Sequence, residues 1–221
     1  MQNINRNELS NMAPRYRAHV INSLSGFKSA NLIGTRSHQG VNNLAIFSSV
    51  FHLGASPALV GFITRPNSVE RHTLENIQQT KHFTINQVNE SFWRAAHQTS
   101  ASYSVDVCEF KQTGLTPDMI DGVNAPFVKE SQLKYALTLK EIIPIKLNDT
   151  LLVIGEITNI ICPQAAIKDD GYIDIESLNT VMVSGLDSYH TSKRLSRLSY
   201  AKPEQLLTKL SLDGEAEQLF T

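Results

Sequence analysis

Residues 43–51 read NLAIFSSVF and residues 58–66 read ALVGFITRP, and these two segments decide the fold. Each is a short run rich in apolar and β-branched residues, and Pro57 lies in the connection between them. Such runs predict two neighbouring strands joined by a short turn. The first strand mixes small polar side chains such as Asn43 and Ser48 with apolar ones, so one of its faces is small and polar. We expect this face to bind a flat ring whose edge carries polar groups.

A helix start follows the strand pair, at residues 71–77, which read RHTLENI. Unpaired N–H groups and the positive end of the helix dipole make such a start a site for phosphate. A guanidinium group such as that of Arg71 can bind phosphate through two hydrogen bonds. The alternative is a solvated ion pair of Arg71 with Glu70 or Glu75. A ring platform beside a phosphate site predicts flavin mononucleotide (FMN) as the ligand.

The rest of the chain also favours strands over helices. We expect further strands near residues 30–36, 82–87, 132–140, 150–162 and 180–184. We expect helices over residues 14–25 and 72–80, and a turn of helix at residues 117–120 in a long polar loop. A further helix, capped by Asn89 or Ser91, is expected to carry Phe92, Trp93 and Ala96 on one side. Many short strands with few helices are typical of a small antiparallel barrel.

The order of these segments carries a family resemblance. The strand ANLIGTRS (residues 30–37) comes first, then the strand pair and the RHT helix, then EFKQTGLTP (residues 109–117) and GEI (residues 155–157). In this collinear order, over roughly residues 20–203, the chain resembles the flavin reductase-like family. The resemblance implies a mainly β fold, an FMN-binding split β-barrel with short peripheral helices.

Three parts are expected along the chain. Residues 1–26 form an N-terminal helical extension, in which Pro14 occupies a first helical turn and Gly26 ends the helix. Residues 27–203 form the flavin reductase-like domain. Residues 204–221 form a C-terminal helical tail.

The expected cofactor-binding residues lie at strand ends, on the polar strand face and at the helix start. They are Thr35, Arg36, Ser37, Asn43, Ala45, Ser48, Ser49, Thr64, Arg65, Arg71, His72 and Thr73. The resemblance implies that residues 35–37 touch the flavin and its ribityl-phosphate chain, and simple polarity at a strand end is the alternative. Many family members have Asp at the position of His72. No catalytic side chain is predicted, because the flavin itself carries the chemistry.

The amino-acid composition makes several classes of binding partner unexpected. The 221 residues include 20 basic and 21 acidic ones, a formal charge of −1, so nucleic acid and anionic membranes are not expected partners. Cys108 and Cys162 lack metal-ligand spacing, and we expect free, half-buried thiols and no metal. The most apolar run, residues 151–162, contains Glu156 and is too short to span a membrane, and the N-terminus shows no apolar signal segment. These features favour a cytoplasmic protein.

The function expected from this pattern is that of an FMN-dependent oxidoreductase of the flavin reductase type, with NAD(P)H as a reductant. One alternative is an electron-transfer protein whose FMN is reduced by a redox partner protein. Another is a flavin-binding module without turnover. No Gly-x-Gly-x-x-Gly follows a strand, so a separate NAD site is not expected.

Two further expectations come from the resemblance. It implies a homodimer with each flavin near the subunit boundary, and the polar tail at residues 185–203 could reach the partner's flavin with Tyr189 or Tyr200. Many reductases of the family carry Gly-Asp-His before the strand that contains Gly-Glu. This chain has Asn-Asp-Thr at residues 148–150, so an imidazole is missing there. We therefore expect NADH-driven flavin reduction to be slow.

Overall fold

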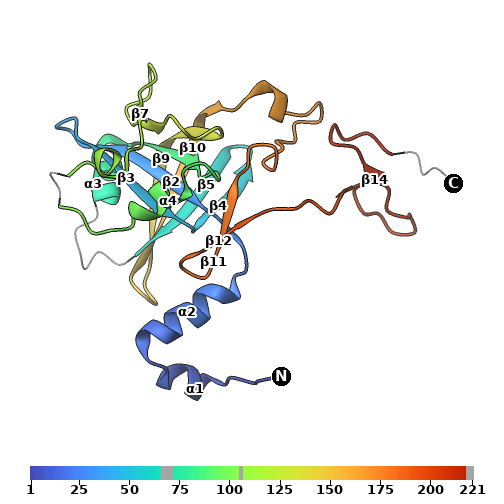
Figure 1. Cartoon of the computed structure of the whole chain (residues 1–221), viewed down its shortest axis with the longest axis horizontal. Coiled ribbons are helices and arrows are strands. Elements are labelled where there is room, and N and C mark those ends of the chain that lie inside the picture. The colour runs from blue at the N-terminus through green and yellow to red at the C-terminus, as the bar shows by residue number, and fades with distance from the viewer. Residues whose placement is uncertain (66–71, 105–106, 218–221) are drawn as a thin grey trace.

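The computed structural model describes residues 1–65, 72–104 and 107–217. Seven strands form one antiparallel sheet in the order β3-β2-β6-β9-β10-β5-β4 (Figure 1). They are β2 (Asn31–Arg36), β3 (Asn42–Phe47), β4 (Val50–Ala55), β5 (Ala58–Thr64), β6 (His82–Gln87), β9 (Lys134–Ile145) and β10 (Thr150–Ile161). The strands predicted near residues 30–36, 58–64, 82–87, 132–140 and 150–162 are thereby confirmed.

The two outermost strands of this sheet, β3 and β4, are separated in the chain only by Ser48 and Ser49. Laid flat, seven strands spaced about 4.8 Å apart would put the sheet edges roughly 29 Å apart. The three peptide steps from β3 to β4 reach only about 11 Å, so the sheet has to curl until its edges meet at this junction. The expected antiparallel barrel results. The single strand predicted over residues 43–51 is wrong, because the chain leaves β2 and joins β5 at this point.

The barrel interior is filled by aliphatic and aromatic side chains from alternate strand positions. Phe62, Phe83, Leu137 and Val153 are all buried there, and the Phe62 and Phe83 rings meet edge to face with centroids 5.8 Å apart. Each such side chain stabilises the fold by about 1.5–3 kcal/mol when fully buried. Gly155 on β10 is required by this packing, because a Cβ there would lie 2.6 Å from Cζ of Phe83.

Short helices and small sheets surround the barrel. The helix α3 (His72–Thr80) confirms the predicted helix and packs against β2 and β3, while α4 (Trp93–Gln98) and α5 (Glu109–Thr113) pack against β3. A second sheet joins β1 (Lys28–Ser29), β11 (Val181–Ser184) and β12 (Ser188–Thr191). The helical turn predicted at residues 117–120 is wrong, since β7 (Pro117–Asp118) pairs there with β8 (Phe127–Val128). The helix comes earlier and ends at Gly114, whose φ is 75°.

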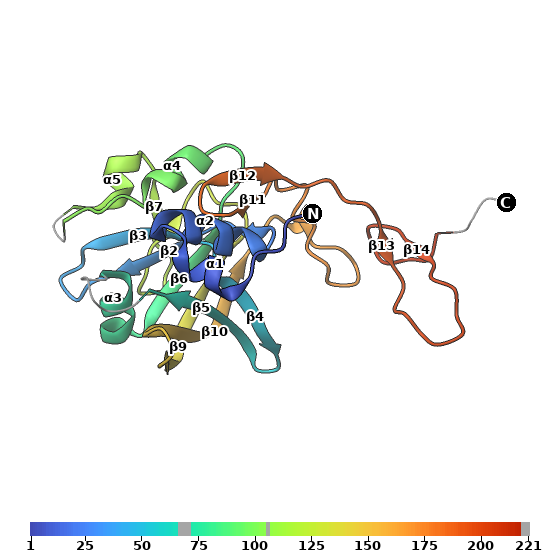
Figure 2. The ribbon, with the colours of Figure 1, turned by 90° about the horizontal axis from the view of Figure 1, so that it is seen from below.

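Both ends of the chain leave the barrel. At the N-terminus, α2 (Pro14–Leu24) confirms the predicted helix, and α1 (Arg6–Asn11) is an additional one, capped by Asn5. At the C-terminus, Figures 1 and 2 show residues 192–217 as an arm that stands away from the barrel. The arm contains β13 (Arg197–Leu198) and β14 (Lys209–Leu210), which pair with each other.

The predicted C-terminal helical tail is wrong over the described residues 204–217. Backbone hydrogen bonds there cross a hairpin, with Glu217 N donating to Lys209 O at 2.9 Å, and Glu204 has a left-handed φ of 61°. A helix of about a dozen residues without a packing surface is marginal in water.

Neither Cys108 nor Cys162 forms a disulfide, and both are half-buried, as expected. No helix in the described ranges is long and apolar enough to cross a membrane.

Candidate functional site

A cavity of about 560 Å³ lies where the β3–β4 junction, the end of β5 and the start of α3 meet. Its volume falls within the range of roughly 300–1,000 Å³ typical of sites for cofactors and small ligands. Eight of the predicted cofactor-binding residues line it: Asn43, Ala45, Ser48, Ser49, Thr64, Arg65, His72 and Thr73. These residues come from three separate elements, β3, β5 and α3, and from connections next to them, and the fold brings them together.

The other four predicted site residues do not line this cavity in the described structure. Thr35 is fully buried beside it. Arg36 donates through Nε to the carbonyl oxygen of Gly40, and the Ser37 hydroxyl accepts from the backbone N–H of Val41. Arg36 and Ser37 thus hold the β2–β3 turn. Arg71 lies outside the described residues.

A buried polar network joins the helix start to the strands. The side-chain amide of Asn43 donates to Oγ1 of Thr35 at 3.1 Å and to Oγ1 of Thr73 at 3.0 Å. Asn76 on α3 also donates to Oγ1 of Thr35, at 3.1 Å. Because an amide nitrogen carries two hydrogens, Asn43 uses both of them here and keeps its carbonyl oxygen as an acceptor. Thr73 accepts in this network, so its own hydroxyl hydrogen can be donated to another group.

The start of α3 is the part of the cavity suited to an anion. His72 and Thr73 open this nine-residue helix, and Arg65 follows the end of β5 on the same cavity. The helix terminus supplies N–H donors and a positive dipole, and the two side chains of basic type can add charge. This donor set fits a phosphate group.

Another part of the cavity is suited to a flat ring. Ala45 and Ser48 present small side chains at the β3–β4 junction, next to the apolar side chain of Phe47. The Ser49 hydroxyl donates to the carbonyl oxygen of Ile63 at 2.8 Å and accepts from its N–H at 3.2 Å. Ser49 therefore fixes the junction against β5, and the small residues beside it leave space for a ring to approach the backbone.

Residues 99–104 form a wall of the cavity and were not among the predicted site residues. Five of these six residues carry a hydroxyl group, and all six line the cavity. The segment follows α4, and Gln98 Nε2 donates to the Tyr103 hydroxyl at 3.1 Å. The run of hydroxyl residues was a usable signal, but it lay in a stretch with the composition of a loop.

A buried carboxyl group on the same cavity was also missed. Glu109 is the first residue of α5, and its Oε2 accepts from the backbone N–H of Leu44 at 3.1 Å. Burial raises the pKa of this carboxyl, although the hydrogen bond from Leu44 and the nearby His72 oppose the shift. Glu109 therefore ties α5 to β3 and places a titratable group inside the cavity.

The residues expected near a nicotinamide or a partner's flavin lie in three different places. Thr150, the first residue of β10, lines the cavity, and its hydroxyl donates to Asn148 Oδ1 at 2.8 Å. The Tyr189 hydroxyl lies 3.0 Å from Nδ1 of His97, and its ring packs on Trp93 of the same chain. Tyr200 is on the C-terminal arm and is 88% exposed.

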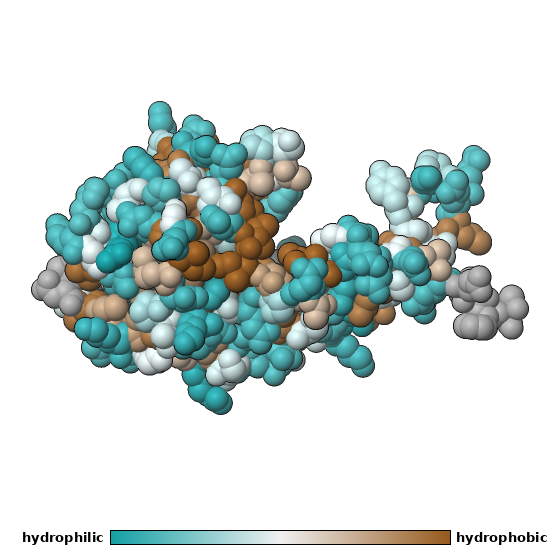
Figure 3. Space-filling model, turned by 90° about the horizontal axis from the view of Figure 1, so that it is seen from above, coloured by the Kyte–Doolittle hydropathy of each residue, from teal (hydrophilic) through white to brown (hydrophobic). Residues whose placement is uncertain are grey.

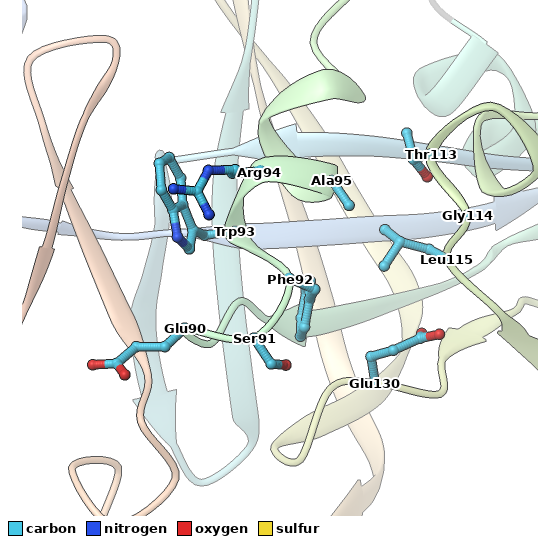
Figure 4. Close-up of a pocket in the computed structure, with 10 residues that line it drawn as sticks. All are labelled: Glu90, Ser91, Phe92, Trp93, Arg94, Ala95, Thr113, Gly114, Leu115 and Glu130. Carbon is cyan, nitrogen blue, oxygen red and sulfur yellow. The ribbon is translucent and has the colours of Figure 1, made fainter.

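A smaller hollow of about 320 Å³ lies between the start of α4 and the end of α5 (Figure 4). Arg94 stacks over the Trp93 ring at 4.5 Å, and the Glu130 carboxylate accepts from the backbone N–H of Thr116. None of the predicted site residues lines this hollow. The larger cavity is therefore the candidate functional site.

Two uncharacterised proteins are similar in sequence to part of this chain. An uncharacterised protein from Aquifex aeolicus is 28% identical over 126 residues, covering 56% of this chain, and one from Halalkalibacterium halodurans is 29% identical over 115 residues, or 51% of this chain. The chain spans 63% and 55% of the lengths of these two relatives.

Among solved structures, a split-barrel protein from Shewanella frigidimarina, provisionally assigned as a flavin reductase, is 51% identical with a TM-score of 0.88. That match covers 91% of this chain and all of the other. Component B of nitrilotriacetate monooxygenase from Bacillus cereus shares the fold at 21% identity and a TM-score of 0.78, over 90% of this chain and 98% of the other. The predicted split β-barrel is confirmed. Residues 25–176 match the flavin reductase like domain, and the chain belongs to that family.

Proposed function

We propose that this protein is an FMN-dependent oxidoreductase of the flavin reductase type. The observation that carries the proposal is the cavity at the β3–β4 junction, where a ring-sized surface of small residues and an anion-binding helix start share one space. Membership of the flavin reductase-like family supports a flavin as the ligand. When bound there, FMN would supply the hydride- or electron-accepting chemistry.

The residues around the cavity divide into three roles. The start of α3, with His72, Thr73 and Arg65, would hold the phosphate, and Ala45 and Ser48 would lie against the ring. Asn43 would offer a carbonyl oxygen to a donor on the flavin, because its amide hydrogens are already used. Thr35 and Asn76 do not line the cavity, but they hold Asn43 in place, because Thr35 accepts hydrogen bonds from the side-chain amides of Asn43 and Asn76. Arg36 and Ser37 are assigned to the β2–β3 turn.

The choice of FMN over FAD follows from the number of anion sites. The described cavity has one helix start with basic side chains beside it, and the sequence has no second glycine-rich loop for a pyrophosphate. Arg71, outside the described residues, remains a predicted phosphate ligand. We expect Arg71→Ala to weaken FMN binding by about 1.5–3 kcal/mol, the scale of a lost hydrogen bond to a charged group.

NAD(P)H is proposed as the reductant, and reduction by a partner protein is the second candidate. A specific observation favours the second: the cavity residue at the start of β10 is Thr150, which offers a hydroxyl but no ring to stack on a nicotinamide. Steady-state NAD(P)H oxidation with added FMN separates the two. Turnover with NAD(P)H supports the reductase, and turnover only with a reduced redox protein supports electron transfer.

The protein is further proposed to be a homodimer. In the sheet, Ile143 pairs with Leu152, and Leu152 pairs with Ile63, which places three apolar residues in one row. Beside that row, a Cβ on Gly61 would meet both Leu152 and Phe51, so the apolar surface continues to β4. Phe51 is 41% exposed and Ile143 37% exposed. Because Ile63 also lines the cavity, a second copy docked on this face would cover one side of the flavin site.

Two measurements test these proposals separately. The visible spectrum of the purified or FMN-loaded protein shows whether flavin is bound, and loss of the flavin on gel filtration at micromolar protein would argue against it. Light scattering gives the mass. A value near 24.6 kDa at micromolar concentration would contradict the homodimer while leaving FMN binding untouched.

A further inference from the structure

Glu109 places a carboxyl group in the same cavity as the proposed phosphate site. Hydrophilic side chains cover much of the face of the molecule in Figure 3, where water can solvate them. Glu109, by contrast, is only 7% exposed, and its Oε2 accepts from the backbone N–H of Leu44 at 3.1 Å. In the described part of the chain, no side chain donates a hydrogen bond to this carboxyl group. A buried carboxylate that lacks such a partner is costly, and it commonly takes up a proton instead.

The ionisable groups around Glu109 form no salt bridge with it in the described structure. His72 on α3 is near enough to act on the carboxyl through its charge, but burial outweighs this effect and raises the pKa of Glu109. The strand β3 carries no ionisable side chain, and Arg94 and His97 on α4 contact aromatic rings outside the cavity. The other described ionisable groups on α5, at its start or on the cavity are Arg65, Tyr103, Cys108 and Lys111. This setting favours the neutral carboxylic acid.

An FMN phosphate bound in this cavity would bring further negative charge close to the carboxyl group. A phosphate monoester carries between one and a half and two negative charges at about pH 7, and a nearby like charge disfavours the ionised form of a carboxyl group. A neutral Glu109 removes this repulsion. It also gains an O–H donor, while its other oxygen keeps the hydrogen bond from Leu44. A carboxyl group kept neutral by its surroundings can therefore donate a hydrogen bond to an anionic oxygen.

We propose that Glu109 binds FMN as a neutral carboxylic acid whose O–H donates to a phosphate oxygen. This inference rests on the proposed FMN site and adds a binding residue to it. At a pH above the pKa of Glu109 in the free protein, FMN binding must then be accompanied by uptake of a proton at this residue. The affinity for FMN should therefore fall as pH rises, by up to about tenfold per pH unit.

The test compares Glu109 with Glu109→Gln. Glutamine keeps an oxygen that accepts from Leu44 and an N–H that can donate to the phosphate, but it cannot ionise. Both proteins also carry His72→Gln, because titration of that imidazole would add a pH dependence of its own. Flavin fluorescence titrations give the FMN dissociation constant at several pH values above about 7, where the phosphate of free FMN is already ionised. Circular dichroism checks the fold.

The matched control is Glu130→Gln in the same background. Glu130 also accepts from a backbone N–H, that of Thr116, but it lies outside the cavity. The protein with Glu109 and the Glu130→Gln control should lose FMN affinity several-fold per pH unit relative to Glu109→Gln. Riboflavin, which has no phosphate, should show no such difference. Parallel FMN profiles with and without Glu109, or the same difference for riboflavin, would overturn the role of Glu109 and leave the FMN site standing. Absence of saturable FMN binding would overturn both.

Infrared spectroscopy tests the proposal in the protein without substitutions. A protonated carboxyl group has a C=O stretching band that an ionised carboxylate lacks. With glutamate isotope-labelled at its side-chain carboxyl carbon, this band moves, while the carbonyl bands of the flavin stay in place. The spectrum of the FMN complex at about pH 7 should contain such a label-sensitive band, and Glu109→Gln should lack it. A complex without the band would show that Glu109 is ionised when FMN is bound, and would overturn the proposal.

Discussion

The side-chain amide of Asn43 on β3 donates to the hydroxyl oxygen of Thr73 on α3 across 3.0 Å. This hydrogen bond joins the strand that faces the proposed ring site to the helix start that faces the proposed phosphate site. The second amide hydrogen of Asn43 goes to Thr35, so the orientation of the amide is fixed from two sides. The polarity of the cavity is set before a ligand arrives, and each of these residues can be tested for a distinct role.

Thr73→Val should weaken FMN binding by about 1.5–3 kcal/mol, the range for a lost hydrogen bond to a charged group. The substitution removes the hydroxyl hydrogen available to the phosphate and leaves one Asn43 hydrogen without its acceptor. Flavin fluorescence titration measures the change. Thr99→Val is the matched control, because Thr99 lines the same cavity but donates to the carbonyl oxygen of Ala96. If Thr73→Val and Thr99→Val weakened FMN binding equally, Thr73 would have no special role toward the phosphate. The same conclusion would follow if Thr73→Val weakened the binding of riboflavin, which has no phosphate, as much as that of FMN.

Thr35→Val should lower the free energy of unfolding by about 1–3 kcal/mol, the cost of leaving buried donors unsatisfied. Thr35 is fully buried and accepts from the amides of both Asn43 and Asn76. Urea denaturation of the apoprotein measures the effect, with Thr158→Val, at an exposed position of β10, as the control. An unchanged midpoint for Thr35→Val would show that the network contributes little to the fold.

Glu109→Gln should change the pH dependence of stability. In the unfolded chain this carboxyl titrates near 4.5, and burial in the cavity raises its pKa in the folded chain. Between these two values the folded state binds more protons than the unfolded state, so the free energy of unfolding falls as pH rises. The stabilising contribution is fully present below pH 4.5 and is lost as pH passes the folded pKa.

The glutamine variant cannot titrate at this position, so that part of the downward slope should disappear. Chemical denaturation of both proteins at several pH values above 4.5 makes the comparison. Parallel profiles for the two proteins would show that Glu109 titrates in the folded chain as it does in the unfolded one.

Thr150→His should raise the rate of flavin reduction by NADH, and the unmodified protein should be slow. Thr150 lines the cavity but offers neither a ring nor a second nitrogen near the expected nicotinamide side. Hydride transfer requires the reacting atoms to be held at near-attack distance, and a loosened contact costs rate steeply. Stopped-flow bleaching of the flavin band records the rate. Fast reduction of the unmodified protein by NADH would show that Thr150 is no obstacle.

Much of this site could be predicted from the sequence, because its main pieces are local. The strand that contains Asn43 and the helix that begins at His72 each have a clear periodicity, and their order along the chain resembles one family. The break at Ser48–Ser49 could not be found that way. It depends on the curling of the whole sheet, which strand propensity does not encode.

The predictions from sequence failed where local preference and long-range contacts favour different structures. Residues 204–217 have helix-forming composition, but they pair as a hairpin beside the root of the arm, where a Cβ on Gly214 would meet the Asp170 side chain. Glu109 was missed because its importance comes from the distant backbone N–H of Leu44, 65 positions away in the chain. Contacts of this kind need the fold before they can be recognised.

The central claim is that the cavity binds FMN through one phosphate and one ring. The measurement that tests it most directly is a fluorescence titration of wild-type protein with FMN, with riboflavin titrated in parallel. We expect saturation at one FMN per chain and an affinity for riboflavin at least tenfold lower, a difference of about 1.4 kcal/mol or more for the missing phosphate. Absence of saturable FMN binding, or equal affinities for FMN and riboflavin, would contradict the account.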